Sequence, residues 1–293
     1  MLSGALVFCL CSITMVTAGS DLDKDGISDE IDPVTELNTS LILEAGEYSF
    51  KNLVVKDNAI ITLKSNLSQP GFKGVKILAD NFTLAQGSTI TADGQGYPEG
   101  QGPGAGGFYK DHNSYGHAGG GSYGGLGTAP ATITYGSALH PGELGSGGGQ
   151  SGSGGGAIQL IISDTILIDG TITANGFLDL SYYSQGAGGS GGSIFITSPQ
   201  FSGSGIISAN GAAGKGAWGY SAGSGGGGRV AIYSEDNTFN GFVEANGIGG
   251  SGEGTVAFID TKNNLLTTGN YFRFQEEDNP ISFTKIQLKN CVA

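Results

Sequence analysis

The chain has 293 residues, of which 56 are Gly and 8 are Pro; 13% are charged, and the net charge is -13 at pH 7. The Gly residues follow no strict every-third-residue period, which excludes collagen, and the small charged fraction argues against a charged disordered chain. The negative charge would repel a phosphate backbone, so we do not expect nucleic acid as a partner.

Residues 1–18 are typical of a secretory signal peptide. They are apolar and uncharged, and end with Val16-Thr17-Ala18, which suits cleavage after Ala18. We therefore predict a mature chain that is secreted or held at the cell surface. No later apolar run reaches about 18 residues, so no transmembrane helix is expected after cleavage. Of the three cysteines (Cys9, Cys11 and Cys291), only the last would remain, so we expect neither an intrachain disulfide nor a thiol zinc site.

An acidic segment, residues 19–36, follows the predicted cleavage site. Asp stands at loop positions 1, 3, 5, 9 and 12, with Gly26 at position 6. Calcium binds about six to eight hard oxygens on a chain that turns sharply, which this spacing provides. The predicted ligands are Asp21, Asp23, Asp25, the carbonyl of Ile27, Asp29 and Asp32.

The spacing resembles an EF-hand loop in which Asp32 replaces the final Glu. Because flanking helices are missing, it is more similar to a thrombospondin type 3 or dockerin-type calcium loop. The alternative interpretation is a solvated acidic linker.

The main signal is an internal repeat. Four copies of [Ile/Val]-x-Ala-[Asn/Asp]-Gly contain Asp93, Asn175, Asn210 and Asn246, and the last three are about 36 residues apart. A segment of alternating apolar residues precedes each copy and begins after a Gly. Period-two alternation with β-branched residues predicts strands. These segments are 75–79, 158–162, 193–196 and 230–233, with a fifth at 256–259.

Stacking of equivalent strands from successive repeats predicts an all-β fold, a parallel β-helix or solenoid with rungs of about 36 residues and long Gly-rich loops. It would span residues 37–262, with a first capping rung at 41–63 and a C-terminal cap at 263–293. Asn-Gly pairs would form corners because these residues tolerate positive φ. The Asn side chains would stack as a hydrogen-bonded ladder starting at Asp93. A β-hairpin sheet competes, because Asn-Gly also favours hairpins, but Gly-rich segments rather than apolar strands follow each pair.

Two interpretations of the Gly-rich loops stay open. They could be flexible linkers, or ordered extended or polyproline II segments that pack closely because they lack side chains. Each Gly block ends one residue before a predicted strand, which favours order. The aromatic residues in these loops could stack on sugars or cover the solenoid edge; they are Tyr97, Tyr109, Tyr115, Tyr123, Tyr182, Tyr183, Trp218 and Tyr220.

The segments 190–196, 205–211 and 225–233, which read SGGSIFI, GIISANG and GGGGRVAIY, resemble Gly-rich repeat regions of large bacterial extracellular and cell-surface proteins. The resemblance covers about residues 41–260. It implies a β-solenoid-like fold and a surface or adhesive role, and it carries no catalytic residues over.

The chemistry-bearing residues outside the acidic loop give weak signals. His112 and His117 with Asp111 could form a metal or acid–base site, but such a pair in a Gly-rich loop is more often solvated. The acidic pairs at 235–236 and 276–278 read as solvated turns. No pair of carboxylates recurs at one solenoid position, as hydrolysis of glycosides would require.

We therefore expect a secreted, non-enzymatic surface or matrix protein with an adhesive or structural role, stabilised by calcium. Glycans or other cell-surface components are its candidate partners. Two alternatives remain: a polysaccharide-active β-helix lyase or hydrolase, and a carbohydrate-binding module.

Overall fold

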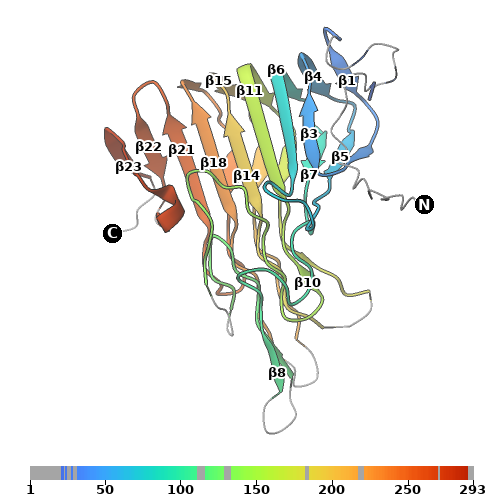
Figure 1. Ribbon diagram of the computed structural model, residues 1–293, viewed down its shortest axis with the longest axis vertical. Coiled ribbons are helices and arrows are strands. Elements are labelled where there is room, and N and C mark those ends of the chain that lie inside the picture. The colour runs from blue at the N-terminus through green and yellow to red at the C-terminus, as the bar shows by residue number, and fades with distance from the viewer. Residues whose placement is uncertain are drawn as a thin grey trace, which may run out of the picture.

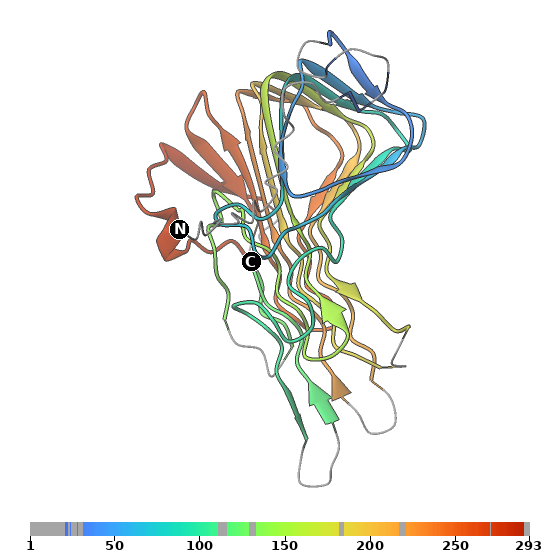
Figure 2. The ribbon, with the colours of Figure 1, turned by 45° about the vertical axis from the view of Figure 1, so that its right-hand side comes forward.

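The computed structural model describes residues 21–22, 24, 28, 32–110, 116–128, 133–181, 185–216, 221–269 and 271–289. Their strands form a parallel β-solenoid with a three-sided body and a long glycine-rich extension (Figures 1 and 2). We call this extension the blade; it consists of the described residues within 95–128, 145–156, 177–192, 212–228 and 248–254. The predicted all-β solenoid is therefore confirmed. The only helix among these residues is a short 3-10 turn, η1 (Glu276–Asp278).

The body has three faces, because a complete rung places one strand on each face. The long strands β6 (Val75–Leu84) and β11 (Ala157–Ile168) are bent at their centre, so that each contributes its first half to face 1 and its second half to face 2. Faces 1 and 2 belong to one twelve-stranded sheet, and face 3 is a separate six-stranded sheet. Face 1 holds β3 (Gly46–Ser49), β14 (Ser193–Thr197), β18 (Arg229–Ser234), β21 (Thr255–Asp260) and the first halves of β6 (Val75–Leu84) and β11 (Ala157–Ile168). Face 2 holds β1 (Thr35–Leu37), β4 (Asn52–Val55), β15 (Gln200–Ser202), β19 (Asp236–Asn237) and the second halves of β6 and β11. Face 3 holds β2 (Leu41–Leu43), β5 (Ile60–Leu63), β7 (Thr89–Thr91), β12 (Thr171–Thr173), β16 (Ile206–Ser208) and β20 (Phe242–Glu244).

Stacking in register builds the core. Ile158 pairs with Val75 on one side and with Ile194 on the other, and Ile194 pairs with Val230, so one inward position repeats in every rung. On face 3 the same holds for the row Ile61, Ile90, Ile172 and Ile207, all buried. Alternation in each strand is thus converted into continuous apolar rows along the axis.

The C-terminal segment extends the larger sheet. β22 (Leu265–Thr268) runs antiparallel to β21, and β23 (Lys285–Leu288) lies parallel on β22 (Figure 1). The segment between these strands folds back, and Phe272, Phe274 and Phe283 pack against a second cluster on the outer side of face 1. That cluster consists of Leu139, Ala231, Ala257, Ile259 and Leu266. The described residues of the C-terminal segment, 263–269 and 271–289, therefore cover an outer face of the body.

The blade is an ordered array of glycine segments, so the interpretation as flexible linkers is wrong for its described residues. Successive N–H groups of segment 187–192 donate to three different neighbours, and each neighbour recurs after three residues. Gly188 and Gly191 donate to the carbonyls of Gly223 and Gly226; the other two pairs donate to segments 146–150 and 174–177. Three residues per turn is the period of a polyproline II helix, which leaves its backbone groups free for neighbouring chains.

Short strands complete the blade. β8 (Phe108–Lys110) and β9 (Gly116–Ala118) form its tip in Figure 1, and β17 (Ser221–Ala222) pairs with β9. A further antiparallel pair joins β10 (Gly152–Ser153) to β13 (Phe177–Leu178). These pieces are the only regular strands among the hydrogen-bonded glycine segments that the structure describes.

The corners differ from the sequence expectation. Of the four corner glycines only Gly94 has a positive φ, of 65°. At Gly176, Gly211 and Gly247 a Cβ would lie 2.0–2.4 Å from a carbonyl oxygen of a neighbouring glycine segment. Glycine is required there because another backbone approaches closely, and not because the turn needs a left-handed conformation.

Candidate functional site

A polar ladder runs along the corner where each rung leaves face 3. The backbone N–H of Asn175 donates to Asp93 Oδ1 at 2.6 Å, that of Asn210 to Asn175 Oδ1 at 2.7 Å, and that of Asn246 to Asn210 Oδ1 at 2.7 Å. The predicted ladder is confirmed, with the difference that each side-chain oxygen accepts from the main chain of the next rung. The amides instead reach Asp93 and Glu244.

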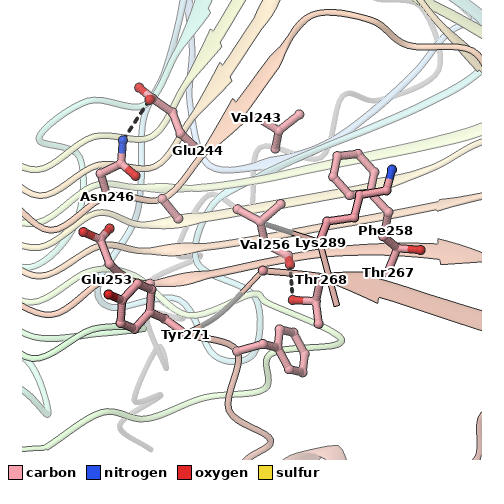
Figure 3. Close-up of a pocket in the computed structure, with 14 residues that line it drawn as sticks. Val243, Glu244, Asn246, Glu253, Val256, Phe258, Thr267, Thr268, Tyr271 and Lys289 are labelled. Atoms are coloured by element: carbon pink, nitrogen blue, oxygen red, sulfur yellow. Dashed lines mark hydrogen bonds between the residues drawn. The ribbon is translucent and has the colours of Figure 1, made fainter. Parts of the chain in front are cut away.

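The ladder ends at a cavity of about 490 Å³ at the C-terminal end of the body (Figure 3). Its lining includes Val243 of β20, Val256 and Phe258 of β21, Thr267 of β22, and Phe272 and Lys289 of the C-terminal segment. Val243, Val256 and Phe258 continue the core rows of the rungs before them, yet they are only half-buried because no further rung of the described chain covers them. The cavity is thus the uncovered end of the hydrophobic core.

Two carboxylates and one amine line the rim of this cavity. Both oxygens of Glu244 accept from the amides of Asn210 and Asn246, at 2.6 and 2.8 Å (the second is drawn in Figure 3). Glu253 accepts from the N–H of Gly247 at 3.0 Å. Glu244 is therefore fixed as part of the ladder. Figure 3 shows the ring of Tyr271 beside Glu253, and this ring is 63% exposed.

A second cavity, of about 570 Å³, lies where segment 133–144 crosses the outer side of face 1. Its wall includes Phe72, Tyr135 and His140, together with the carboxylates of Glu143 and Glu277. The His140 ring lies 5.6 Å from that of Tyr233 and 5.9 Å from that of Phe195, centroid to centroid. An apolar aromatic wall with a few polar groups is typical of small-molecule sites.

Asp278 holds this region together. It was expected in a solvated turn, but it is buried, and its Oδ1 accepts from the N–H of Leu139 at 3.0 Å and from Ser137 Oγ at 2.5 Å. Oδ2 accepts from the N–H of Gln275 at 2.7 Å. The carboxylate therefore joins segment 133–144 to the C-terminal segment.

A buried arginine joins the blade to the body, and no charge pattern in the sequence distinguishes it from the other basic residues. Arg229 is fully buried; its Nε donates to the carbonyl of Tyr135 and its Nη1 to Thr255 Oγ1, at 3.0 and 3.2 Å. Its guanidinium lies 5.3 Å from the ring centroid of Tyr123, within cation–π range. Burial lowers the pKa of Arg229 from its usual value, and the nearby Tyr123 opposes this.

Of the tyrosines around Arg229, Tyr123 is fully buried and Tyr135 is half-buried. Tyr123 shares a 2.7 Å hydrogen bond with Ser193 Oγ, and burial raises the pKa of Tyr123 to about 12. Burial also raises the pKa of Tyr135 well above its usual value. Tyr123, one of the aromatics considered for sugar stacking, is therefore inaccessible to a ligand. The sequence signal was a tyrosine amid glycines, which does not distinguish a buried ring from an exposed one.

Of the predicted calcium ligands, the structure places Asp21 and Asp32. Asp32 is buried, its Oδ1 accepts from the N–H of Val34 at 3.0 Å, and its buried Oδ2 has no hydrogen-bond partner among the residues that the structure describes. A buried carboxylate oxygen without a donor fits a cation ligand. Asp23, Asp25, Ile27 and Asp29 lie outside the described residues.

The remaining candidates are only partly placed. His117 is half-buried in β9 of the blade, and its suggested partners His112 and Asp111 lie outside the described residues. Within the described ranges no group of three or more His, Cys, Asp or Glu could hold a metal ion. No helix in that same part of the chain is long and apolar enough to cross a bilayer.

Three comparisons with known proteins complete the description. A scan against protein-family models found no match, and searches of curated proteins and of solved structures found no similar protein. The class of the protein therefore rests on its fold: it is a parallel β-solenoid that carries a glycine blade.

Proposed function

We propose that the chain is an extracellular structural protein with an adhesive role at a cell surface or in a matrix. The observation that carries the proposal is the blade, because its glycine segments are cross-linked to one another and to the body by main-chain hydrogen bonds. Such a network favours a fixed shape, which suits a scaffold. The predicted signal peptide and the resemblance to Gly-rich bacterial surface proteins support the extracellular location.

Glycans are the proposed partners, and the cavity beside His140 is the proposed site. Its aromatic side chains would stack on sugar rings, and its two carboxylates would accept hydrogen bonds from hydroxyls. Because Glu143 and Glu277 face this cavity on an acidic protein, neutral or amine-bearing sugars suit it better than uronates.

A glycan array with the mature chain tests this part of the proposal. We expect neutral or amino-sugar ligands, and we expect Phe72→Ala to weaken their binding at least tenfold. Leu67→Ala, at an exposed apolar residue outside the cavity, is the matched control and should bind as the wild type does. Silence across the array would refute the glycan partner.

An enzyme is the second candidate function, because two carboxylates line this cavity and glycoside hydrolysis uses a pair of carboxylates. Incubation with polysaccharides of different charge, followed by detection of new reducing ends or unsaturated products, separates the two functions. Turnover that is lost in Glu143→Gln would favour the hydrolase and overturn the non-enzymatic role.

Calcium is the proposed stabilising ion of residues 19–36. Asp32 would hold it through the oxygen that lacks a donor, together with Asp21, Asp23, Asp25, Asp29 and the Ile27 carbonyl. We expect an affinity on the order of 10⁻⁴–10⁻³ M, as in extracellular modules. Calorimetry with Ca²⁺ should show binding that Asp23→Ala with Asp25→Ala abolishes. Absence of binding heat, together with an unchanged melting temperature in excess Ca²⁺, would refute the site.

A further inference from the structure

Face 3 ends earlier than face 1 at the C-terminal end of the body. β20 is the last strand of the six-stranded sheet, and β16 is its only partner among the described strands. The larger sheet, in contrast, continues from β21 through β22 to β23. β20 is therefore an open edge opposite a wall of two additional strands.

The register identifies which main-chain groups of this edge are free. The N–H of Phe242 donates to the carbonyl of Gly205, and the carbonyl of Glu244 accepts from Ala209, so both residues face β16. In a parallel strand, alternate residues direct their N–H and C=O to opposite neighbours. The N–H and C=O of Val243 therefore point toward the open side.

The open edge adjoins apolar surface. Val243, Val256 and Phe258 line the cavity of Figure 3. The equivalent residues of earlier rungs are covered by the next strand of the solenoid. The ladder is unfinished at the same place: Asn175 and Asn210 each accept an N–H of the following rung, while Asn246 is the last of the series. An added strand would gain main-chain hydrogen bonds, apolar contacts and this side-chain acceptor together.

The geometry limits what can occupy the edge. A second copy of the chain would need to stack a whole rung, but β22 already pairs with the edge of β21 on face 1. The net charge of -13 on each copy also opposes such stacking. A glycan cannot match the spacing of peptide N–H and C=O groups. A single extended polypeptide segment needs no edge on face 1 and carries N–H and C=O groups at the required spacing.

We propose that the β20 edge binds an extended polypeptide segment of another protein, which pairs in parallel with β20 and extends face 3 by one strand. The rows of face 3 specify its chemistry. A β-branched aliphatic residue continues the row of Ile172, Ile207 and Val243 over the exposed core. Three residues later, its main-chain N–H donates to Asn246 Oδ1, as that of Asn246 does to Asn210.

The probe is a fluorescently labelled peptide with the sequence of residues 170–176, Gly-Thr-Ile-Thr-Ala-Asn-Gly, which occupies an equivalent place inside the sheet. We expect saturable binding to the mature chain by fluorescence polarisation. A peptide with aspartate in place of its isoleucine, and one N-methylated at residues that face the β20 edge, should bind at least tenfold more weakly. Equal binding by all three peptides would overturn the proposal, as would absence of binding by the first.

Val243→Pro tests the edge on the protein side. It removes the N–H that points to the open side and leaves the pairing with β16 intact, because proline is tolerated on edge strands in that orientation. We expect a loss of peptide affinity of at least tenfold, while the matched control Val243→Thr keeps the N–H and retains most of it.

Hydrogen exchange of the wild-type protein keeps the test informative if the proline variant fails to fold. The Val243 amide should exchange at least tenfold more slowly when the peptide is bound. Unchanged exchange at saturation, or a concentration-dependent dimer in sedimentation without peptide, would contradict the proposed occupant.

Discussion

The body and the blade reach close packing by opposite means. In the body, alternating aliphatic side chains form rows that fill the interior, and the backbone pairs in regular ladders. In the blade, glycine predominates, and successive N–H groups of a segment such as 187–192 are directed in turn to three different neighbouring segments. A high glycine content is commonly associated with flexible linkers, but here it permits a backbone-only packing that larger residues would prevent.

Truncation of a core side chain should produce the largest effect. Ile196→Ala removes a fully buried residue of the face 1 row and should lower the free energy of unfolding by about 2–5 kcal/mol. The control Ile42→Ala, at a residue 59% exposed, should stay within about 0.5 kcal/mol. Urea denaturation followed by circular dichroism measures both. Similar losses in the two variants would mean that the rows do not carry the stability of the body.

Alkaline pH should weaken the junction between the two regions. Burial raises the pKa of Tyr123 from 10.0 to about 12, so the neutral phenol is favoured in the folded state. The neutral phenol therefore contributes about 3 kcal/mol to the free energy of unfolding below the pKa that Tyr123 has in the unfolded chain. This contribution is lost as pH rises from about 10 toward 12. Tyr123→Phe should lower the free energy of unfolding at about pH 8, because the hydrogen bond to Ser193 is lost. Above about pH 10, the stability of this variant should decline less than that of the wild type. Parallel alkaline declines in both proteins would exclude Tyr123 as the source.

Addition of a methyl group to a glycine of the blade should have the next largest effect on stability. A Cβ at Gly189 would lie 1.9 Å from the carbonyl oxygen of Ser153, so a backbone segment must move. We expect Gly189→Ala to destabilise the protein by about 1–3 kcal/mol, even though Gly→Ala otherwise stabilises by reducing the entropy of the unfolded chain. Gly269→Ala, where no atom lies within 4 Å, should be neutral or slightly stabilising in the same melt. A neutral Gly189→Ala would show that the blade is not tightly packed.

The ladder should show the smallest effect. Asn210→Leu removes the acceptor of the Asn246 N–H and the donor to Glu244 Oε1. These hydrogen bonds are exposed and part-buried, so a loss of about 1 kcal/mol in the free energy of unfolding is expected. Asn240→Leu, at an exposed residue outside the ladder, should change stability less. Matching shifts in melting temperature would contradict a stabilising role of the stacked Asn side chains.

The body could be predicted from sequence because its physics is periodic. Alternation within 158–162 and 193–196, together with the recurrence of Asn175, Asn210 and Asn246, predicts parallel stacking in register, and the structure has this register. The ladder followed from the same spacing, because side chains at equivalent places of successive rungs meet.

The blade and the cavities could not be predicted to the same degree. A run such as Gly225-Gly226-Gly227-Gly228 contains no side-chain pattern, and its partners come from segments far away in the chain. Burial of Arg229 depends on Tyr123 and Tyr135, which the long insertion brings against the body. Asp278 reads as solvated until segment 133–144 is placed over it. These features depend on how long segments fold back, which a local pattern does not encode.

The corner through which every rung leaves face 3 has a consequence for how this architecture can vary. The chain departs after the Ala-Asn-Gly corner and re-enters at the glycine before the next face 1 strand, so the interval between these points lies outside the apolar rows. The interval after Asp93 is far longer than the one after Asn210. Asp93 and Asn175 are 82 residues apart, whereas Asn210 and Asn246 are 36 residues apart. Sequence inserted or removed there would leave the rungs in phase, so evolution could lengthen the outer part of such a protein while its interior stays unchanged.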